Sequence, residues 1–365
     1  MAYHPEYPIC TICGIRLEEP LCYLEELAER SPDERDWKND VVALSGPHWS
    51  PGESPSLDLA DDAVHRFDAV ATWHPSVGLV LLPDKRSVDT QSRYESDKPN
   101  TLVPPATMQL FMGIHAACEE VANRVMRTSF NARVRSIGHL WMTLERRCAR
   151  PMDRHPHMNF LPYLPESQSG QPRSFGTGRY FVPYSCIIRY GDEWDGWWED
   201  DPIVIPDLTT QLLSNLEPVS RTTGPLPSKF MQQFKGRLMT LPQELKNQLV
   251  SLLQENPVCL NCNYLMPQYL WKQAFLQIPF LWDLHTKLVL EKAGSEPSET
   301  EEWNWEKITR QVLSPAQPPS PISYASKKGY VWDYDKVGLR VPPGFTNRRR
   351  IWQIVEEMWP NDVGV

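Results

Sequence analysis

The sequence LMTLPQELKNQLVSLLQ at residues 238–254 gives the clearest indication of a fold in this 365-residue chain. Its leucines recur at helical spacing, which places Leu245, Leu249 and Leu252 on one face. Pro242 suits the first position of a helix, because the N–H that proline lacks would have no intrahelical partner there. We therefore predict an amphipathic helix that begins at Pro242.

Helical patterns continue on the C-terminal side of this stretch. YLWKQAFLQI (269–278) places Trp271 and Phe275 on one side of a second predicted helix, and FLWDLHTKLVL (280–290) continues the apolar pattern. Helical character dominates the region from 206 to 313, although polar and proline-containing breaks interrupt it. A mainly helical part of the protein is the expectation.

The start of the first helix resembles the F-box. That pattern reads Leu-x-x-Leu-Pro-x-Glu-Leu, and it is matched here by Leu238, Leu241, Pro242, Glu244 and Leu245. In the F-box family, a small helical module docks onto the Skp adaptor of a cullin ubiquitin ligase. The resemblance implies a Skp-type adaptor as partner, with the rest of the chain recruiting a substrate that the sequence does not identify.

Other short segments resemble those of fungal F-box-like proteins. They are Cys10, Cys13 and Gly14 as CxxCG, His115 and Cys118 as His-x-x-Cys, the Leu270-Trp271-Phe275 segment, Asn304 to Ile308, and NRRRIW at 347–352. The chain departs from the F-box pattern at NPVCLNCNYLMPQ (256–268), which replaces an Arg/Lys-rich turn before the tryptophan. The resemblance thus covers most of the chain through short motifs.

The adaptor-binding face implied by the resemblance lies on the leucine-rich helix. It consists of Leu241, Pro242, Leu245, Leu249 and Leu252. The alternative is that these side chains form ordinary core against the N-terminal part of the chain, because a protein of this length needs such apolar stripes.

Two pairs of residues have the chemistry of a metal site. Cys10-x-x-Cys13 and His115-x-x-Cys118 together supply the Cys₃His set that is found in tetrahedral zinc sites. An amphipathic helix is predicted over 111–125, where positions i and i+3 share a face. A structural zinc ion is the one cofactor predicted. The alternative is that Cys118 is a small buried hydrophobe and His115 a core histidine.

Short elements are predicted in the N-terminal half. FDAVATW (67–73) and VGLVLL (77–82) have the β-branched and aromatic content of strands, and RYFVPYSCIIRY (179–190) indicates one or two more. A second amphipathic helix is predicted over 134–148. With 35 prolines in the chain, these elements are expected to be joined by many rigid loops.

The predicted fold class is α+β, mainly α. An N-terminal mixed body with a CxxCG start is predicted over 1–225, and an F-box-like helical module over 226–313. A linker, a strand and a C-terminal helix that packs back onto the body are predicted over 314–365.

Charge and hydropathy exclude some classes of function. The 37 basic and 46 acidic residues give a net charge of −9, which disfavours nucleic acid as a partner. No signal peptide and no membrane-length apolar run is visible, so a cytoplasmic or nuclear protein with reduced cysteines is expected. Arg348 to Arg350 is the only basic run. It is typical of the solvated start of a helix, with binding of an acidic partner or nuclear localisation as the alternatives.

Three further segments hold metal-binding or aromatic residues. Cys259-x-x-Cys262 is predicted to be two free thiols in a loop, rather than half a zinc site or a redox pair. The acids of GDEWDGWWEDD (191–201) are expected in water with the tryptophans in the core, and a partner-binding patch is the alternative. His155 and His157 are expected in a solvated loop rather than on a metal.

Motifs of enzyme catalysis are missing from the sequence. It contains no GxSxG, phosphate loop, GxGxxG or HExxH. We therefore predict a non-enzymatic interaction protein, an F-box-like substrate receptor or scaffold in a cullin-type ubiquitin ligase. The alternatives are a zinc-stabilised scaffold without a ligase role and an enzyme with a metal-dependent site within 60–220.

Overall fold

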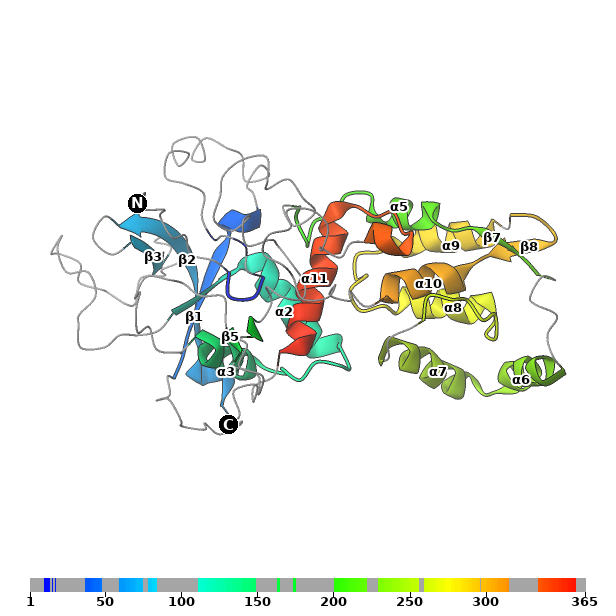
Figure 1. Cartoon of the computed structure of the whole chain (residues 1–365), viewed down its shortest axis with the longest axis horizontal. Coiled ribbons are helices and arrows are strands. Elements are labelled where there is room, and N and C mark those ends of the chain that lie inside the picture. Colours follow the sequence, from blue (N-terminus) through cyan, green and yellow to red (C-terminus); the bar gives the residue numbers. More distant parts are fainter. Residues whose placement is uncertain are drawn as a thin grey trace.

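The computed structural model describes residues 10–13, 15, 17, 37–47, 59–74, 78–83, 111–148, 163–164, 173–174, 200–221, 229–255, 259–295, 297–314 and 334–358. Within these residues helices predominate over short strands, which agrees with the predicted mainly α, α+β class. Figure 1 shows an elongated molecule with a sheet near one end and a layer of helices at the other. None of the described helices is long and apolar enough to cross a lipid bilayer.

A four-stranded antiparallel sheet forms the centre of the N-terminal body. Its strands are β1 (Val41–Ser45), β2 (His65–His74), β3 (Gly78–Pro83) and β4 (Phe111–His115), in the order β3-β2-β1-β4. All five residues of β1 are buried, and Val41 to Leu44 belong to the hydrophobic core.

The sheet confirms two predicted strands and corrects one predicted helix. β2 and β3 correspond to the strands expected at 67–73 and 77–82. The helix expected over 111–125 is wrong in its first turn, because residues 111–115 form β4, all of which pairs with β1. α2 (Ala116–Thr128) begins only afterwards. Pairing with a neighbouring strand has here outweighed an apolar spacing that also fits a helix.

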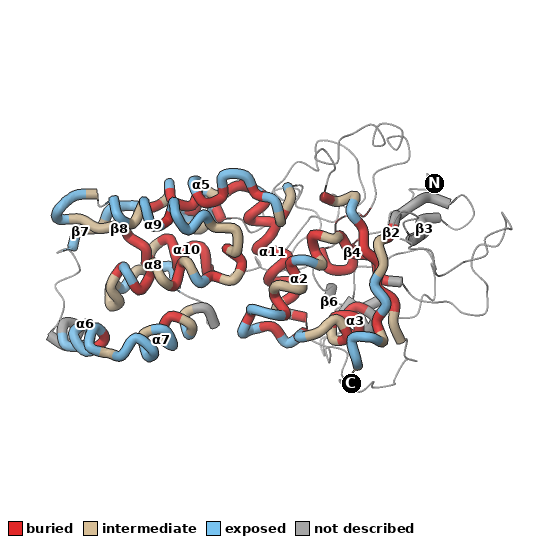
Figure 2. The backbone as a smooth tube through the Cα atoms, turned by 180° about the vertical axis from the view of Figure 1, so that it is seen from behind, coloured by how far each residue is buried: buried red, intermediate tan, exposed pale blue. Residues whose placement is uncertain are grey.

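Three helices complete the N-terminal body. α3 (Ile137–Cys148) confirms the helix predicted at 134–148, apart from its first residues. α11 (Pro343–Glu357) contacts α2, which in turn contacts β1. Figure 1 shows α11 between the sheet and the helical layer, and Figure 2 shows it buried along most of its length. α11 therefore belongs to the interior of both parts.

The basic run on α11 is not solvated, and that prediction is wrong. Arg348, Arg349 and Arg350 are all buried. The guanidinium of Arg348 donates to both carboxylate oxygens of Asp283 at 2.7 Å, and Arg350 donates to the carbonyl of Cys13 at 2.7 Å. The helix is packed on two sides at this point, and buried acceptors offset the cost of taking these charges out of water.

Helices and a two-stranded sheet form the C-terminal layer. Its helices are α5 (Leu208–Ser214), α8 (Gln268–Leu276), α9 (Thr286–Gly294) and α10 (Trp305–Leu313), and its strands are β7 (Pro218–Ser220) and β8 (Glu301–Trp303). α10 packs on α8, where the rings of Phe275 and Trp305 lie 5.7 Å apart. α5 contacts α9, and β7 pairs with β8. α5 and β7 were predicted to belong to the N-terminal body at 1–225, but they pack on elements of the predicted helical module.

Two helices form an arm at the edge of this layer. α6 (Lys229–Thr240) and α7 (Gln243–Glu255) lie below α8 and α10 in Figure 1, and α7 contacts α8. α7 confirms the leucine-rich helix and begins directly after Pro242. Figure 2 shows most of this α6–α7 arm as exposed.

The remaining described elements are short. They are η3 (Trp37–Asn39), η4 (Asp61–Ala63), η6 (Tyr334–Val337), β5 (Tyr163–Leu164) and β6 (Arg173–Ser174). The strands predicted at 179–190 and most of the linker and strand predicted after 314 lie outside the described residues.

Candidate metal centre

Residues Cys10 to Cys13 form a tight turn closed by hydrogen bonds to the cysteine sulfurs. Cys10 N donates to the carbonyl of Ile15 at 2.7 Å. Cys13 N donates to Cys10 Sγ, and Ile15 N donates to Cys13 Sγ, both at 3.5 Å. Backbone N–H groups directed at sulfur favour its thiolate form, which is the form that binds metal.

The turn is fastened to the end of β4. The backbone N–H and the hydroxyl of Thr11 both donate to the carbonyl of Gly113, at 3.0 and 3.2 Å. Because Gly113 lies two residues before His115, these bonds set the position of both cysteines relative to the histidine.

His115 and Cys118 come from the junction of β4 and α2. His115 is the last residue of β4, with φ −69° and ψ 145°, and Cys118 lies in the first turn of α2. The sequence predicted that the two residues share one face of a helix, and this is wrong. They are brought together where the chain turns from strand to helix. The ring of Trp37 meets the edge of the His115 ring at a centroid distance of 4.8 Å.

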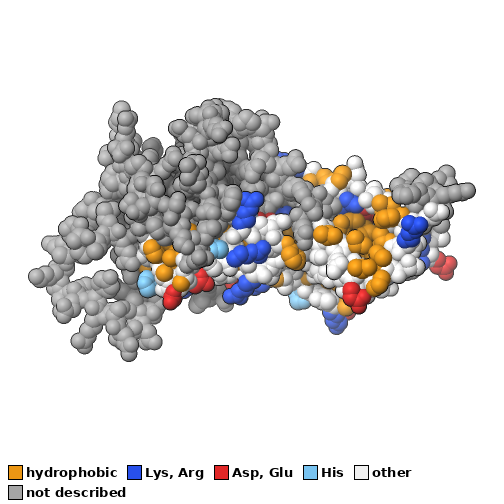
Figure 3. Space-filling view, turned by 90° about the horizontal axis from the view of Figure 1, so that it is seen from below, with side chains coloured by type: hydrophobic (Ala, Val, Ile, Leu, Met, Phe, Trp, Pro, Cys, Tyr) orange, Lys and Arg blue, Asp and Glu red, His pale blue; other side chains and the backbone are white. Residues whose placement is uncertain are grey.

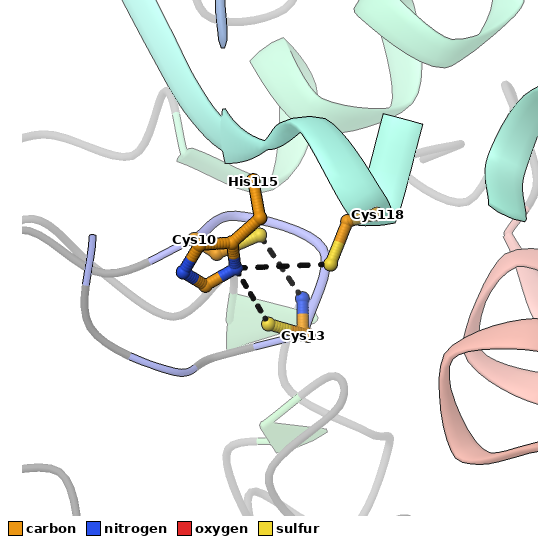
Figure 4. A group of neighbouring side chains, drawn as sticks. All are labelled: Cys10, Cys13, His115 and Cys118. Atoms are coloured by element: carbon orange, nitrogen blue, oxygen red, sulfur yellow. Dashed lines mark hydrogen bonds between the residues drawn. The ribbon is translucent and has the colours of Figure 1, made fainter. Parts of the chain in front are cut away.

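The four predicted ligands converge. The three sulfurs and the ring nitrogen of Cys10, Cys13, His115 and Cys118 all lie within 4.8 Å of one another. Figure 4 shows His115 Nδ1 directed at two of the sulfurs, 3.4 Å from Cys13 Sγ and 3.8 Å from Cys118 Sγ. Ligand atoms around a tetrahedral zinc ion lie about 3.5–3.8 Å apart. The group could therefore hold a metal ion once its more widely separated ligand atoms move closer together.

Electrostatics within the cluster favour a charged state without metal. Burial opposes ionisation of the Cys10 thiol, yet hydrogen bonds with Cys118 and Cys13 hold its pKa well below the usual value. Burial raises the pKa of Cys118 well above its usual value. Burial also disfavours a charged His115, but the negative charges of Cys13 and Cys10 outweigh it and raise the His115 pKa to about 10. A metal ion that binds here replaces protons on these groups.

The donor set is that of a closed site. Cys10, Cys13, His115 and Cys118 supply four protein ligands, and each side chain is at most 4% exposed. Structural zinc sites use four protein ligands, whereas catalytic sites keep a position for water or substrate. Within the described residues, this is the only group of three or more His, Cys, Asp or Glu side chains close enough to hold a metal ion.

The predicted adaptor-binding residues lie on or next to α7. Leu245 and Leu252 are 43% and 50% exposed, and Pro242 is also exposed. Leu241 and Leu249 are partly exposed. The stripe therefore does not form core against the N-terminal body, which was the alternative interpretation.

The other predicted segments are described only in part. Cys259 and Cys262 have free thiols in a loop, one exposed and one half-buried, and no further metal ligands join them among the described residues. Of residues 191–201 the structure describes Asp200 and Asp201, and burial raises the pKa of Asp200. His155 and His157 lie outside the described residues.

One residue beside the site was not predicted to take part in it. Arg350 Nη1 donates to the carbonyl of Cys13, a contact between residues 337 positions apart in the sequence. Arg350 lies on α11, the C-terminal helix predicted within 314–365, but no local pattern identifies what a buried arginine will contact.

Comparisons with known proteins give no relative: no family model, no curated protein and no solved structure matches the chain. The resemblance to F-box-like proteins remains a prediction from short motifs.

Proposed function

We propose that this chain is a non-catalytic interaction scaffold with a structural zinc ion held by Cys10, Cys13, His115 and Cys118. The observation that carries the proposal is the convergence of these four buried ligand atoms within 4.8 Å. A closed Cys₃His set suits a structural ion better than a catalytic one, because it leaves no position for substrate. The ion would fasten the N-terminal turn to the β4–α2 junction, and its binding energy would add to folding stability.

Metal analysis of the purified full-length chain tests this proposal. We expect about one equivalent of zinc per chain, as for a single four-ligand site. Cys118→Ser should lose most of the zinc, whereas Cys259→Ser changes a cysteine outside the cluster and should keep it. Less than about half an equivalent in folded wild-type protein would contradict the proposal.

A second proposed function is docking of the α6–α7 arm on a Skp-type adaptor of a cullin ubiquitin ligase. The exposure of Leu245 and Leu252 on α7 favours it, because large apolar side chains exposed together often mark interaction sites. Phe234 and Met239 on α6 are exposed as well. Figure 3 views the face on which the arm lies and shows hydrophobic side chains gathered over it.

The adaptor is proposed as the occupant because the same helix carries the F-box-like start. Leu245 is at once the last residue of that pattern and an exposed side chain of α7. The N-terminal body, whose sheet lies at the other end of the molecule from the arm in Figure 1, would then recruit the substrate.

A titration of the full-length chain with purified Skp adaptor tests the docking proposal. The double variant Leu245→Asp, Leu252→Asp should weaken binding by about 30-fold or more, the range of residues at the centre of an interface. Both side chains are exposed, so the variant should fold. The matched control is Leu288→Asp, Leu290→Asp, which alters exposed leucines of α9 and should bind normally. Absence of binding by folded wild-type protein would contradict this function and leave the zinc proposal intact.

A further inference from the structure

The charge of the metal-loaded centre poses a physical problem. A divalent ion, three thiolates and a neutral imidazole sum to a net charge of −1. The four ligands are almost completely buried, so water cannot solvate this charge. A buried charge is costly unless an opposite charge or hydrogen bonds compensate it.

Arg350 places a cation beside this centre. Its side chain is 2% exposed, and its Nη1 donates to the carbonyl of Cys13 at 2.7 Å. This bond holds the guanidinium at the turn that carries Cys10 and Cys13, two of the three thiolate ligands, so its positive charge acts on them at short range.

Neighbouring arginines on α11 are directed at other partners. Arg348 binds both oxygens of Asp283 in the C-terminal layer, and Arg349 lies 3.9 Å from Glu356 on the same helix. α11 thus contributes buried cations to separate places, and the one contributed by Arg350 is next to the metal ligands.

We propose that Arg350 is the counter-ion of the metal centre. Its guanidinium balances the net charge of −1 that a divalent ion, three thiolates and one neutral imidazole produce, and so makes the centre suitable for a divalent ion. This inference rests on the proposed zinc centre. A cation near the thiolates lowers their electron donation to the metal, because it stabilises the electrons on sulfur. Arg350 acts through the ligands and does not bind the metal, so it is a positioning and charge-balancing residue.

Cobalt(II) substitution of the full-length chain tests the role of Arg350, because sulfur-to-cobalt charge-transfer absorption reports on the thiolates. Arg350→Gln removes the charge but keeps an N–H donor, and it should move this band to longer wavelength. It should also weaken metal binding about tenfold or more in competition with a chelator. Arg350→Lys keeps the charge and should retain the wild-type band and most of the affinity. If Arg350→Gln does not fold, the test rests on Arg350→Lys, which must retain the wild-type band and most of the affinity.

Arg348→Met is the matched control for a purely structural effect. Arg348 is equally buried on the same helix, so this variant should lose stability but keep the band of the folded protein. An unchanged band and affinity in Arg350→Gln would overturn the counter-ion role alone. Equal losses in the Gln and Lys variants would overturn it as well, because charge would not be the cause. No cobalt band in wild-type protein would overturn the metal centre itself.

Discussion

Arg348 and Arg310 each hold a guanidinium in the protein interior, where acceptors surround it. Arg348 donates to the carbonyls of Pro202 and Ile203 as well as to Asp283. Arg310 lies at 2.8 Å from a carboxylate oxygen of Glu306. The partners of Arg348 thus come from distant parts of the sequence, whereas Glu306 lies on the same helix as Arg310. At the scale of single residues, removal of one partner leaves a costly unpaired charge in both cases.

Tyr334 provides a pH-dependent prediction at the same scale. Burial raises the pKa of Tyr334, outweighing the nearby Arg349, and its hydroxyl donates to the carbonyl of Val312 at 3.0 Å. Tyr334 ionises near pH 10 in the unfolded chain but only at higher pH in the folded chain. The contribution of the neutral Tyr334 to the free energy of unfolding is therefore intact below about pH 10 and is lost progressively above it.

Urea unfolding of wild-type protein and Tyr334→Phe between pH 8 and about pH 11 measures this effect. Above about pH 10, the wild-type free energy of unfolding should fall faster than that of Tyr334→Phe, by at most about 1.4 kcal/mol per pH unit. A difference between the two proteins that stays constant over this range would show that Tyr334 ionises normally in the folded chain.

Among the secondary-structure elements, α10 holds a neighbouring loop in place through two of its side chains. Glu306 accepts from the backbone N–H groups of Asn263 and Tyr264 at 2.8 and 2.9 Å, and Arg310 donates to the carbonyl of Cys259 at 2.8 Å. The buried pair on α10 thereby fixes the loop that leads from the α6–α7 arm to α8.

Glu306→Ala should destabilise the protein by about 3–5 kcal/mol, because it leaves Arg310 buried without this carboxylate and two backbone donors without their acceptor. Lys307→Ala on the same helix breaks an exposed ion pair with Glu217 and should cost at most about 1 kcal/mol. Chemical denaturation of both variants compares the two costs. Similar small losses would mean that the Glu306 pair contributes little to stability.

Elements with one strong periodicity could be predicted from the sequence, and ambiguous ones could not. The leucines of α7 fit a helix alone, and the helix is there. Phe111, Ile114 and Cys118 also fit a helix, but the first two lie on β4, because the edge of β1 offers hydrogen bonds that no local pattern reveals. Cys10, Cys13, His115 and Cys118 nevertheless converge into a group that could hold a metal ion, since residue types and spacing carry that information in either conformation.

α11 links the two ends of the whole molecule. Arg350 reaches the turn that carries Cys13, and Arg348, two residues earlier, reaches Asp283 in the C-terminal layer. Figure 1 shows α11 between these parts. The sequence predicted that a C-terminal helix would pack back onto the body, but its place between the two parts depends on buried long-range contacts that periodicity does not specify.

Metal removal should loosen one part of the molecule more than the other. With a chelator, hydrogen exchange should rise first in β4, the start of α2 and α11, which adjoin the centre. α8 and α10 pack on each other through Phe275 and Trp305 and should change little. Equal loss of protection throughout the described elements would instead indicate that the protein unfolds as one unit.

Zinc K-edge X-ray absorption on the purified full-length chain reports the atoms bound to the metal and therefore tests the proposed Cys₃His centre. We predict one zinc ion with about three sulfur ligands near 2.3 Å and one nitrogen ligand near 2.0–2.1 Å. Loss of about one sulfur in Cys13→Ser or Cys118→Ser would assign the ligands. A shell of oxygen and nitrogen ligands without sulfur, or no bound zinc in the folded wild-type chain, would show that these four residues do not form a zinc centre.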